Sequence, residues 1–281
     1  MGSSVAEIES ELAKLRVEET EEATPYQRTS VMTHIAWVPK RWVGAAENVL
    51  AGLAERHPSR TIVLLPESGR GDALEGDVEI DCYPVGAGRS ICTETIRIHL
   101  SGEKLRAPAS IVQPLLISDL PVFLRWRGEP EWGGDAFTQL IDVADRLIVD
   151  STEWENVPAP YARLAEIFDR TAASDIAWAR TSRWRNQLAT LWPEIADVQR
   201  IRVIGTIAQG NLLAGWLRSR LSHHVELEVE EEDRLVGVEV DGRATPFPPG
   251  APPDPADVLS DELDRFGRDP IYEAAVRAAV A

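Results

Sequence analysis

The distribution of apolar residues predicts alternating strands and helices along the chain. Two compact apolar runs, 122–126 and 147–149, are separated by a glycine-broken loop and a segment with helical spacing. An earlier pair of runs, 28–38 and 61–65, flanks a helical segment that begins at Pro39. Strands that are apolar on both faces and joined through helices are typical of parallel sheets. The pattern predicts an α/β fold with a mixed, mostly parallel sheet flanked by helices, and it leaves open a division into two related α/β domains.

A β-hairpin is predicted between these two units. Residues 78–83 and 90–100 are extended runs separated by Gly86-Ala87-Gly88, whose glycines permit a turn. If the hairpin is symmetric about Ala87, Cys82 lies opposite Cys92, close enough for a disulfide to be considered. Two interpretations stay open, a redox-active thiol pair or two small buried side chains of the kind common in cytoplasmic proteins.

The two ends of the chain have a different character from the middle. Residues 4–22 have a thin apolar stripe at helical spacing, so residues 1–24 are predicted to form an acidic N-terminal helix. Residues 225–240 predict an acidic two-stranded hairpin with its turn near Asp233, and a proline-rich loop follows. Asp269 and Pro270 predict the start of a terminal helix over 271–280. We therefore expect an N-terminal domain over 25–155 and a C-terminal domain over 156–281.

Composition and charge exclude several classes of protein. The 281 residues are 44% hydrophobic and carry a net charge of −17. Residues 1–24 have seven acidic and two basic residues, and residues 222–281 have fifteen acidic and five basic residues. Both ends would repel a nucleic acid. No apolar run approaches the roughly 20 residues of a membrane helix, and the polar N-terminus is no secretory signal. Two cysteines give no disulfide framework, so a reduced, cytoplasmic protein is expected.

An arginine-rich segment is the main candidate binding site. It contains Arg180, Arg183, Trp184 and Arg185. Guanidinium groups bind phosphates and carboxylates through paired N–H donors, so these residues are candidates for binding an anion or an acidic partner surface. The alternative is a solvated helix whose arginines pair with the many carboxylates of the chain.

No catalytic or metal-binding set is evident, and no cofactor is expected. The five histidines lack metal-ligand spacing, and the glycines of 204–211 match neither a dinucleotide nor a phosphate-loop motif. Asp150 follows a buried strand, so it could lie near a ligand or cap the next element. Three tryptophans near loops could anchor an interface or pack beneath those loops: Trp126, Trp132 and Trp154.

Several sequence segments, in this order, resemble the OpcA family of glucose-6-phosphate dehydrogenase assembly proteins. They are RTSVMTHIAW from residue 28, HPSRTIVLL from residue 57, ICTETIRIHL from residue 91, DLPVFLRWRG from residue 119, ADRLIVDS from residue 144, the Trp184-Arg185 pair, and ELDRFGRDPIYEAAV from residue 262. Family members often have a second tryptophan where this chain has Arg125, and they differ in cysteine content. These departures weaken any transfer of an aromatic surface or of thiol regulation to this chain.

The resemblance implies a bacterial, cytoplasmic, non-catalytic protein of the pentose phosphate pathway. Such a protein binds glucose-6-phosphate dehydrogenase, favours its active oligomer and raises its activity, without binding nucleic acid or membranes. A rival interpretation is a sugar-phosphate sensor or enzyme that uses an arginine-ringed crevice near Asp150, Thr206 and Asn211.

Overall fold

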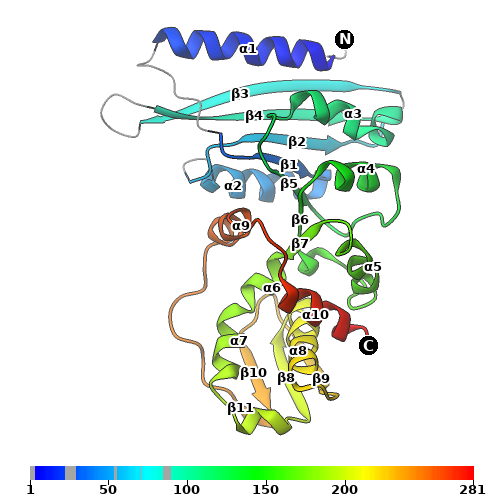
Figure 1. The fold of residues 1–281 in the computed structure, drawn as a ribbon, viewed down its shortest axis with the longest axis vertical. Coiled ribbons are helices and arrows are strands. Elements are labelled where there is room, and N and C mark those ends of the chain that lie inside the picture. The colour runs from blue at the N-terminus through cyan, green and yellow to red at the C-terminus, as the bar shows by residue number, and fades with distance from the viewer. Residues whose placement is uncertain (1–3, 23–29, 54–55, 70, 85–89) are drawn as a thin grey trace. The chain divides into compact units, whose positions relative to one another are not determined.

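The computed structural model describes residues 4–22, 30–53, 56–69, 71–84 and 90–281 (Figure 1). Contacts divide the chain into two compact units, Met1–Leu147 and Ile148–Ala281. The fold is α/β, with a mostly parallel sheet and flanking helices, as the hydrophobic pattern predicts.

Five strands form the sheet of the first unit, with β3 outermost, in the order β3-β4-β2-β1-β5. The bounds are Thr33–Trp37 for β1, Arg60–Pro66 for β2, Leu74–Pro84 for β3, Ser90–Leu100 for β4 and Val122–Trp126 for β5. Neighbouring pairs among β4, β2, β1 and β5 are parallel, whereas β3 and β4 are antiparallel. All five residues of β1 and of β5 are buried, as expected for strands covered on both faces.

The helices of the first unit cover both faces of this sheet (Figure 1). They are α1 (Val5–Glu22), α2 (Val43–Leu53), α3 (Pro108–Val112) and α4 (Asp135–Val143). Helix α1 buries Ile8 and Leu12. Ile8 lies over Gly76 of β3, where an added Cβ would be 2.5 Å from its Cδ1 atom. The absence of a side chain at Gly76 thus allows the helix to lie close to the strand.

The hairpin is confirmed, and its register is the one that symmetry about Ala87 predicts. Cys82 pairs with Cys92, Asp81 with Thr93, and Glu79 with Thr95. Because side chains alternate between the faces of a strand, Gly76 and Cys82 share the face that carries α1. Residues 77, 79, 81 and 83 point to the other face. The turn residues Gly86, Ala87 and Gly88 lie outside the described residues, as do residues 28–29 at the start of the predicted strand over 28–38.

The second unit contains a four-stranded sheet in the order β11-β10-β8-β9. Its strands are β8 (Arg200–Gly205), β9 (Glu226–Glu231), β10 (Gly237–Val240) and β11 (Arg243–Ala244). The unit also has β7 (Ala172–Asp175), which lies beside β6 (Arg146–Val149), the strand that spans the division. The helices are α5 (Pro160–Ile167), α6 (Ile176–Arg180), α7 (Ser182–Ala189), α8 (Ile207–Leu221), α9 (Pro255–Leu263) and α10 (Pro270–Ala279).

The predicted acidic hairpin is wrong. Strands β9 and β10 both pair with β8, the first parallel and the second antiparallel, so β8 lies between them. The reason is chemical: Arg202 of β8 has Glu228 opposite it on β9 and Glu239 opposite it on β10. Its guanidinium contacts both carboxylates and that of Glu230. The central arginine therefore separates glutamates that would otherwise repel one another.

Helices α8 and α10 cross at a glycine. A Cβ added at Gly215 of α8 would lie 2.2 Å from the carbonyl oxygen of Ala275 in α10, so only a glycine allows the two helices to approach this closely.

The predicted terminal helix is confirmed. Asp269 caps it by accepting from the N–H groups of Ile271 and Tyr272, each at 3.0 Å.

Candidate functional site

The arginine-rich segment 180–185 lies on α6 and α7, and its guanidinium groups have three separate sets of partners. Arg180 donates to Asp150 at 3.0 Å. Arg183 donates to the carbonyls of Pro248 and Pro249, at 2.8 and 2.7 Å, and to that of Gly250. Arg183 thereby holds the proline-rich loop, and its role in binding a partner or an anion stays a prediction.

Arg185 and Trp184 are engaged within the second unit. The Arg185 guanidinium lies 3.4 Å from the centre of the Trp178 ring and donates to Thr181 Oγ1 at 3.0 Å. Burial lowers the pKa of Arg185 to about 10. Trp184 is buried in the core that includes Leu188 and Val203. A binding role for these two residues therefore also stays a prediction.

A buried carboxylate pair lies at the carboxyl ends of β6 and β7. Asp150 follows β6, and Asp175 is the last residue of β7, with an exposed fraction of 0%. Asp175 Oδ1 accepts from the N–H groups of Ser151 and Ala177, at 3.0 and 2.8 Å. Asp150 caps the turn that follows it and pairs with Arg180, so the expected capping role is confirmed.

Two tyrosines complete this cluster. The hydroxyl oxygen of Tyr161 lies 3.0 Å from Ser151 Oγ, and the hydroxyl of Tyr272 donates to Asp175 Oδ2 at 3.5 Å. Burial, and next the charge of Asp150, raise the pKa of the Asp175 carboxyl to about 7, against hydrogen bonds from Ser151 and Ala177 that lower it. The cluster can therefore exchange a proton near neutral pH.

Sequence reasoning missed Asp175, although a signal was present. An aspartate just before an apolar helical segment is a common N-cap, and Asp175 precedes Ile176-Ala177-Trp178. The strand that ends at Asp175 has only four residues, too few for the pattern to identify. The clustering of Tyr161 and Tyr272 with it depends on contacts between residues far apart in the chain.

A hollow of about 550 Å³ lies beside this cluster, lined by Ser151, Thr206 and neighbouring residues. The expectation of an arginine-ringed crevice is wrong for it. The charged residues among those that line it are all acidic: Glu155, Glu231, Glu232 and Asp233. Thr206 caps α8, and Asn211 donates to the Ile207 carbonyl at 2.9 Å. Four carboxylates would repel a sugar phosphate.

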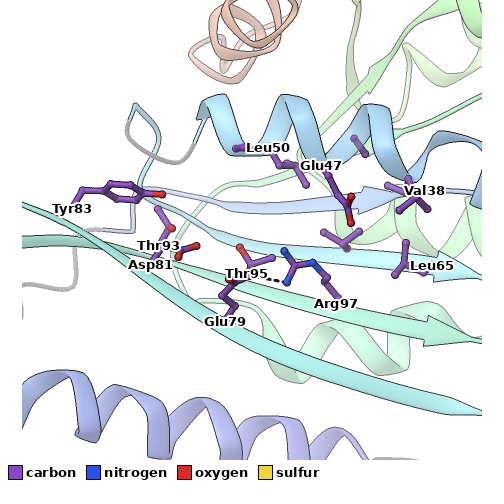
Figure 2. Close-up of a pocket in the computed structure, with 14 residues that line it drawn as sticks. Val38, Glu47, Leu50, Leu65, Glu79, Asp81, Tyr83, Thr93, Thr95 and Arg97 are labelled. Carbon is purple, nitrogen blue, oxygen red and sulfur yellow. Dashed lines mark hydrogen bonds and ion pairs between the residues drawn. The ribbon is translucent and has the colours of Figure 1, made fainter.

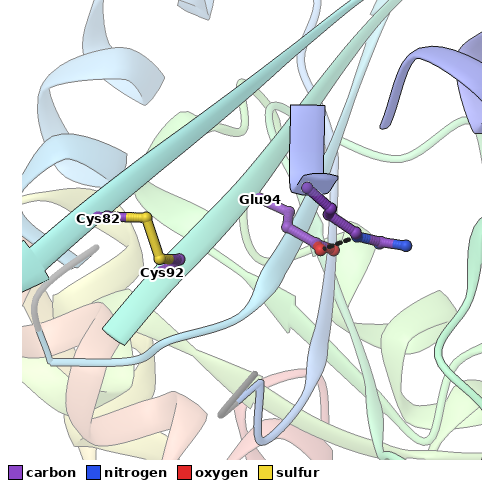
Figure 3. Close-up of a disulfide and its surroundings, with 4 residues drawn as sticks. Cys82, Cys92 and Glu94 are labelled. Carbon is purple, nitrogen blue, oxygen red and sulfur yellow. Dashed lines mark hydrogen bonds and ion pairs between the residues drawn. A yellow bond between two sulfur atoms is a disulfide. The ribbon is translucent and has the colours of Figure 1, made fainter. Parts of the chain in front are cut away.

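Cys82 and Cys92 form a disulfide between β3 and β4 (Figure 3). Their Cα atoms are 4.1 Å apart, and no cysteine is free. The expectation of two reduced cysteines is thus wrong for this structure, because the cross-strand register places the side chains in direct opposition. A redox role for the pair stays a prediction.

The same face of the hairpin carries a buried glutamate, Glu94 (Figure 3). It accepts from Arg16 of α1 at 2.6 Å and from Arg60 of β2 at 2.8 Å. Burial acts to raise the pKa of Glu94, but hydrogen bonds and charges from both arginines outweigh it and lower the pKa. This pairing links the N-terminal helix to the sheet.

The opposite face of the hairpin borders a cavity of about 280 Å³ beneath α2 (Figure 2). Its apolar wall belongs to the core formed by Val38, Ala46, Val63 and Leu65. Its polar side consists of side chains from β3, β4 and α2: Glu47, Glu79, Asp81, Tyr83, Thr93, Thr95 and Arg97. The cavity therefore combines an apolar wall with several carboxylates.

Of the three tryptophans considered as interface anchors, Trp126 and Trp154 are buried, which favours packing beneath loops. Trp126 stacks on Trp37, with ring centroids 4.8 Å apart, and Trp132 meets Phe137 edge to face. Trp192 is the large exposed tryptophan of the second unit, with an exposed fraction of 66%.

His34 and His57 are buried, His99 and His223 have local partners, and His224 is exposed. Burial, followed by the charges of Arg125 and His57, lowers the pKa of His34 to about 4. His99 lies 2.7 Å from Glu67, and His223 lies 2.8 Å from the Val198 carbonyl. Within the described part of the chain, no group of three or more metal-ligating side chains is assembled. No described helix is long and apolar enough to cross a membrane.

Two family models match this chain. One, described as the N-terminal domain of a glucose-6-phosphate dehydrogenase subunit, matches residues 51–166. The other, described as the C-terminal domain of the same subunit, matches residues 171–247. Together the matches cover most of both units.

Three cyanobacterial proteins named OpcA, each described as a proposed OxPP cycle protein, are similar to this chain. The Nostoc punctiforme protein is 26% identical over 245 residues, covering 79% of this chain and 52% of its own length. The Synechococcus elongatus protein is 28% identical over 241 residues, covering 74% and 51%. The Synechocystis protein is 26% identical over 181 residues, covering 60% and 38%. The chain thus spans about half the length of these relatives, or less.

Proposed function

The chain belongs to the OpcA family of glucose-6-phosphate dehydrogenase subunits, and we propose that it is a non-catalytic partner that binds this dehydrogenase and favours its active oligomer. In this proposal the chain raises the rate of the enzyme and forms or breaks no covalent bond itself. It would work in the cytoplasm, where the oxidative pentose phosphate pathway operates.

The observation that carries the proposal is the pair of family matches, both described as domains of a dehydrogenase subunit. The described side chains add support. Arg180, Arg183 and Arg185, the first candidates for binding a small anion, already have partners within the chain. The hollow beside Thr206 is acidic. Both features favour recognition of a protein over capture of a phosphorylated metabolite.

Activation of this kind requires a difference in affinity. The protein must bind the active oligomer of the dehydrogenase more tightly than the inactive form, because equal affinity for both would shift no population. A tenfold preference corresponds to about 1.4 kcal/mol at each independent binding site. No direct contact with the active site of the dehydrogenase is needed.

The test is to mix the protein with glucose-6-phosphate dehydrogenase in equimolar amounts at micromolar concentration. We expect a larger oligomer by mass photometry and a higher maximal rate or substrate affinity. An unrelated protein of similar negative charge serves as the control. If oligomer size, maximal rate and substrate affinity all stay unchanged, the proposal is excluded.

The predicted role of Arg183 can be tested in the same assay. Arg183→Glu should weaken binding of the dehydrogenase if this side chain, or the loop that it holds, meets the enzyme. Arg163→Glu is the matched control, since Arg163 is an exposed arginine of the same unit that pairs only locally with Glu166. Equal binding by both variants would remove Arg183 from the interface.

A further inference from the structure

The cavity beneath α2 is lined by two carboxylates that make no hydrogen bond in the described structure, the partly buried Asp81 and the exposed Glu47. Arg97, the one arginine that lines it, donates to Glu79 at 2.8 Å and to Asp77 at 3.4 Å. No hydrogen bond or ion pair of the described structure engages Asp81 or Glu47. Burial, and next the charge of Glu79, raise the pKa of Asp81, against the charge of Arg97. The cavity therefore carries an excess of negative charge.

The hydroxyl group of Thr93, opposite Asp81, is a second and independent feature of the cavity. Thr93 is its register partner on β4, has an exposed fraction of 5% and lines the cavity. Its hydroxyl has no hydrogen-bond partner among the described residues. The hydroxyl opens into the cavity, where it can accept a hydrogen bond from a ligand. Figure 2 shows Thr93 and Asp81 side by side, near Tyr83.

The remaining wall defines what else the ligand must contain. Leu50 of α2 and Val63 of β2 supply apolar surface, and Val38 and Leu65 extend it. A volume of about 280 Å³ is below the roughly 300–1,000 Å³ usual for drug-sized ligands. The ligand must be small and positively charged, with several N–H donors at one end and an aliphatic stem at the other. An ammonium group supplies three donors and no acceptor.

We propose that this cavity binds a primary alkylammonium group, whose nitrogen lies between the Asp81 carboxylate and the Thr93 hydroxyl and whose stem lies against Leu50 and Val63. Two sources share this chemistry, a free aliphatic amine and a lysine side chain of a protein partner. The second source rests on the proposed function, whereas the first does not.

The first experiment uses the purified full chain and a free amine. Calorimetric titration with 1-butylamine should show saturable binding, whereas 1-butanol and butyrate, which match its stem but not its charge, should show none. Absence of saturable binding of 1-butylamine at tens of millimolar would overturn the proposal.

Two substitutions locate the site. Asp81→Asn should weaken 1-butylamine binding by about tenfold or more, because it removes a charge-assisted hydrogen bond. Glu75→Gln is the matched control, since Glu75 is exposed, lies on the same face of β3 and lies outside the cavity lining. Equal loss in both variants would indicate general electrostatic attraction and overturn the proposed site.

Thr93→Val separates binding from folding. Because the hydroxyl has no partner, the variant should be at least as resistant to urea as the parent protein, yet bind 1-butylamine several-fold more weakly. Unchanged binding in a folded Thr93→Val variant would exclude Thr93 from the site.

The second experiment identifies the source of the ammonium group. If it belongs to a lysine of the dehydrogenase, 1-butylamine should compete with the enzyme, and Asp81→Asn should weaken the complex about tenfold. If the complex forms normally in Asp81→Asn while amine binding is lost, the ligand is a free amine. Failure of the proposed function would leave the butylamine result intact, so the two failures are distinguishable.

Discussion

Asp175 has a buried carboxyl whose neighbour, Asp150, is also acidic. Its pKa of about 7 lies above the value of about 3.9 for an unfolded aspartate. Between these two pH values the folded state keeps a proton that the unfolded state has lost. The free energy of unfolding therefore falls as pH rises from about 4 to about 7, and this contribution is flat above pH 7.

Asp175→Asn should remove that decline. The amide oxygen can still accept from Ser151 and Ala177, while the side chain can no longer ionise. Relative to the parent, the free energy of unfolding of the variant should gain up to about 1.4 kcal/mol per pH unit between pH 5 and 7. Urea unfolding at several pH values measures this. Asp169→Asn, at an exposed site, should retain the decline, and parallel profiles for parent and Asp175→Asn would contradict the assignment.

Gly215→Ala should destabilise the second unit. The added Cβ would lie 2.2 Å from the Ala275 carbonyl oxygen and 3.0 Å from the Ala279 nitrogen, both backbone atoms that cannot rotate away. We expect a loss of about 1–3 kcal/mol in the free energy of unfolding, measured by urea denaturation. Gly44→Ala in α2 is the control, since nothing lies within 4 Å of its added Cβ. That control should be neutral or stabilising by up to about 1 kcal/mol.

At the scale of elements, both apolar and charged contacts hold α1 to the sheet. Ile8 packs over Gly76, and Arg16 pairs with Glu94, which Arg60 also contacts. Because the pKa of Glu94 is lowered, the stabilising contribution of this pairing is present above the ordinary carboxyl pKa. It is lost as pH falls through the lowered value.

Glu94→Gln should therefore loosen α1. The substitution removes the carboxylate charge that accepts from Arg16 and Arg60, and breaking a buried pair in this way typically costs about 3–5 kcal/mol. Hydrogen exchange of the α1 amides should accelerate in the variant. Glu75→Gln, exposed on the other face of β3, should leave the exchange rates unchanged. Slow exchange in Glu94→Gln would show that Ile8 and Leu12 suffice to hold the helix.

The disulfide gives a second prediction for the hairpin. Closing a loop of about ten residues stabilises a fold by roughly 2–3 kcal/mol in the chain-entropy model. Replacing both Cys82 and Cys92 by serine should lower the free energy of unfolding of the first unit by that amount. The redox role requires more, namely that reduction of the parent protein changes activation of the dehydrogenase. If the protein, denatured under oxidising conditions, still has two titratable thiols, it contains no disulfide. That result would exclude both the predicted loss of stability and the redox role.

Elements set by local pattern could be predicted from the sequence. The spacing of apolar residues located β5 and β6, and the glycines between β3 and β4 gave the register that opposes Cys82 and Cys92. The pairing of β9 and β10 could not be predicted, because two acidic strands close in sequence suggest a hairpin. Their separation by β8 depends on Arg202, whose contacts are visible only in three dimensions. The partners of Arg180 and Arg183 were missed for the same reason.

At the scale of the whole molecule, negative charge is concentrated toward the end of the chain. Residues 222–281 hold fifteen acidic and five basic residues, and the residues of β9 are largely exposed. Such a distribution accelerates association with a basic partner and is screened by salt over about 8–10 Å. If the dehydrogenase meets this part of the chain, binding should be faster at low ionic strength.

Replacing Glu231 and Glu232 by glutamine tests this idea. We expect a lower association rate with the dehydrogenase and a weaker salt dependence, while the dissociation rate changes little. Stopped-flow mixing at several salt concentrations provides both rates. Glu9→Gln with Glu11→Gln, which removes the same charge from α1, is the matched control. A salt dependence that is equal in both double variants would place the encounter surface elsewhere.

The outermost position of β3 has a consequence for how the protein behaves when concentrated. One side of this strand has unpaired backbone groups, which could template strand addition from a second copy. On the face opposite α1, this strand carries Glu75, Asp77, Glu79 and Asp81. These would meet the same carboxylates of the neighbour, and their repulsion opposes edge-to-edge aggregation. Neutralising these four carboxylates would remove that protection and leave an edge strand that can pair with a second copy of the chain.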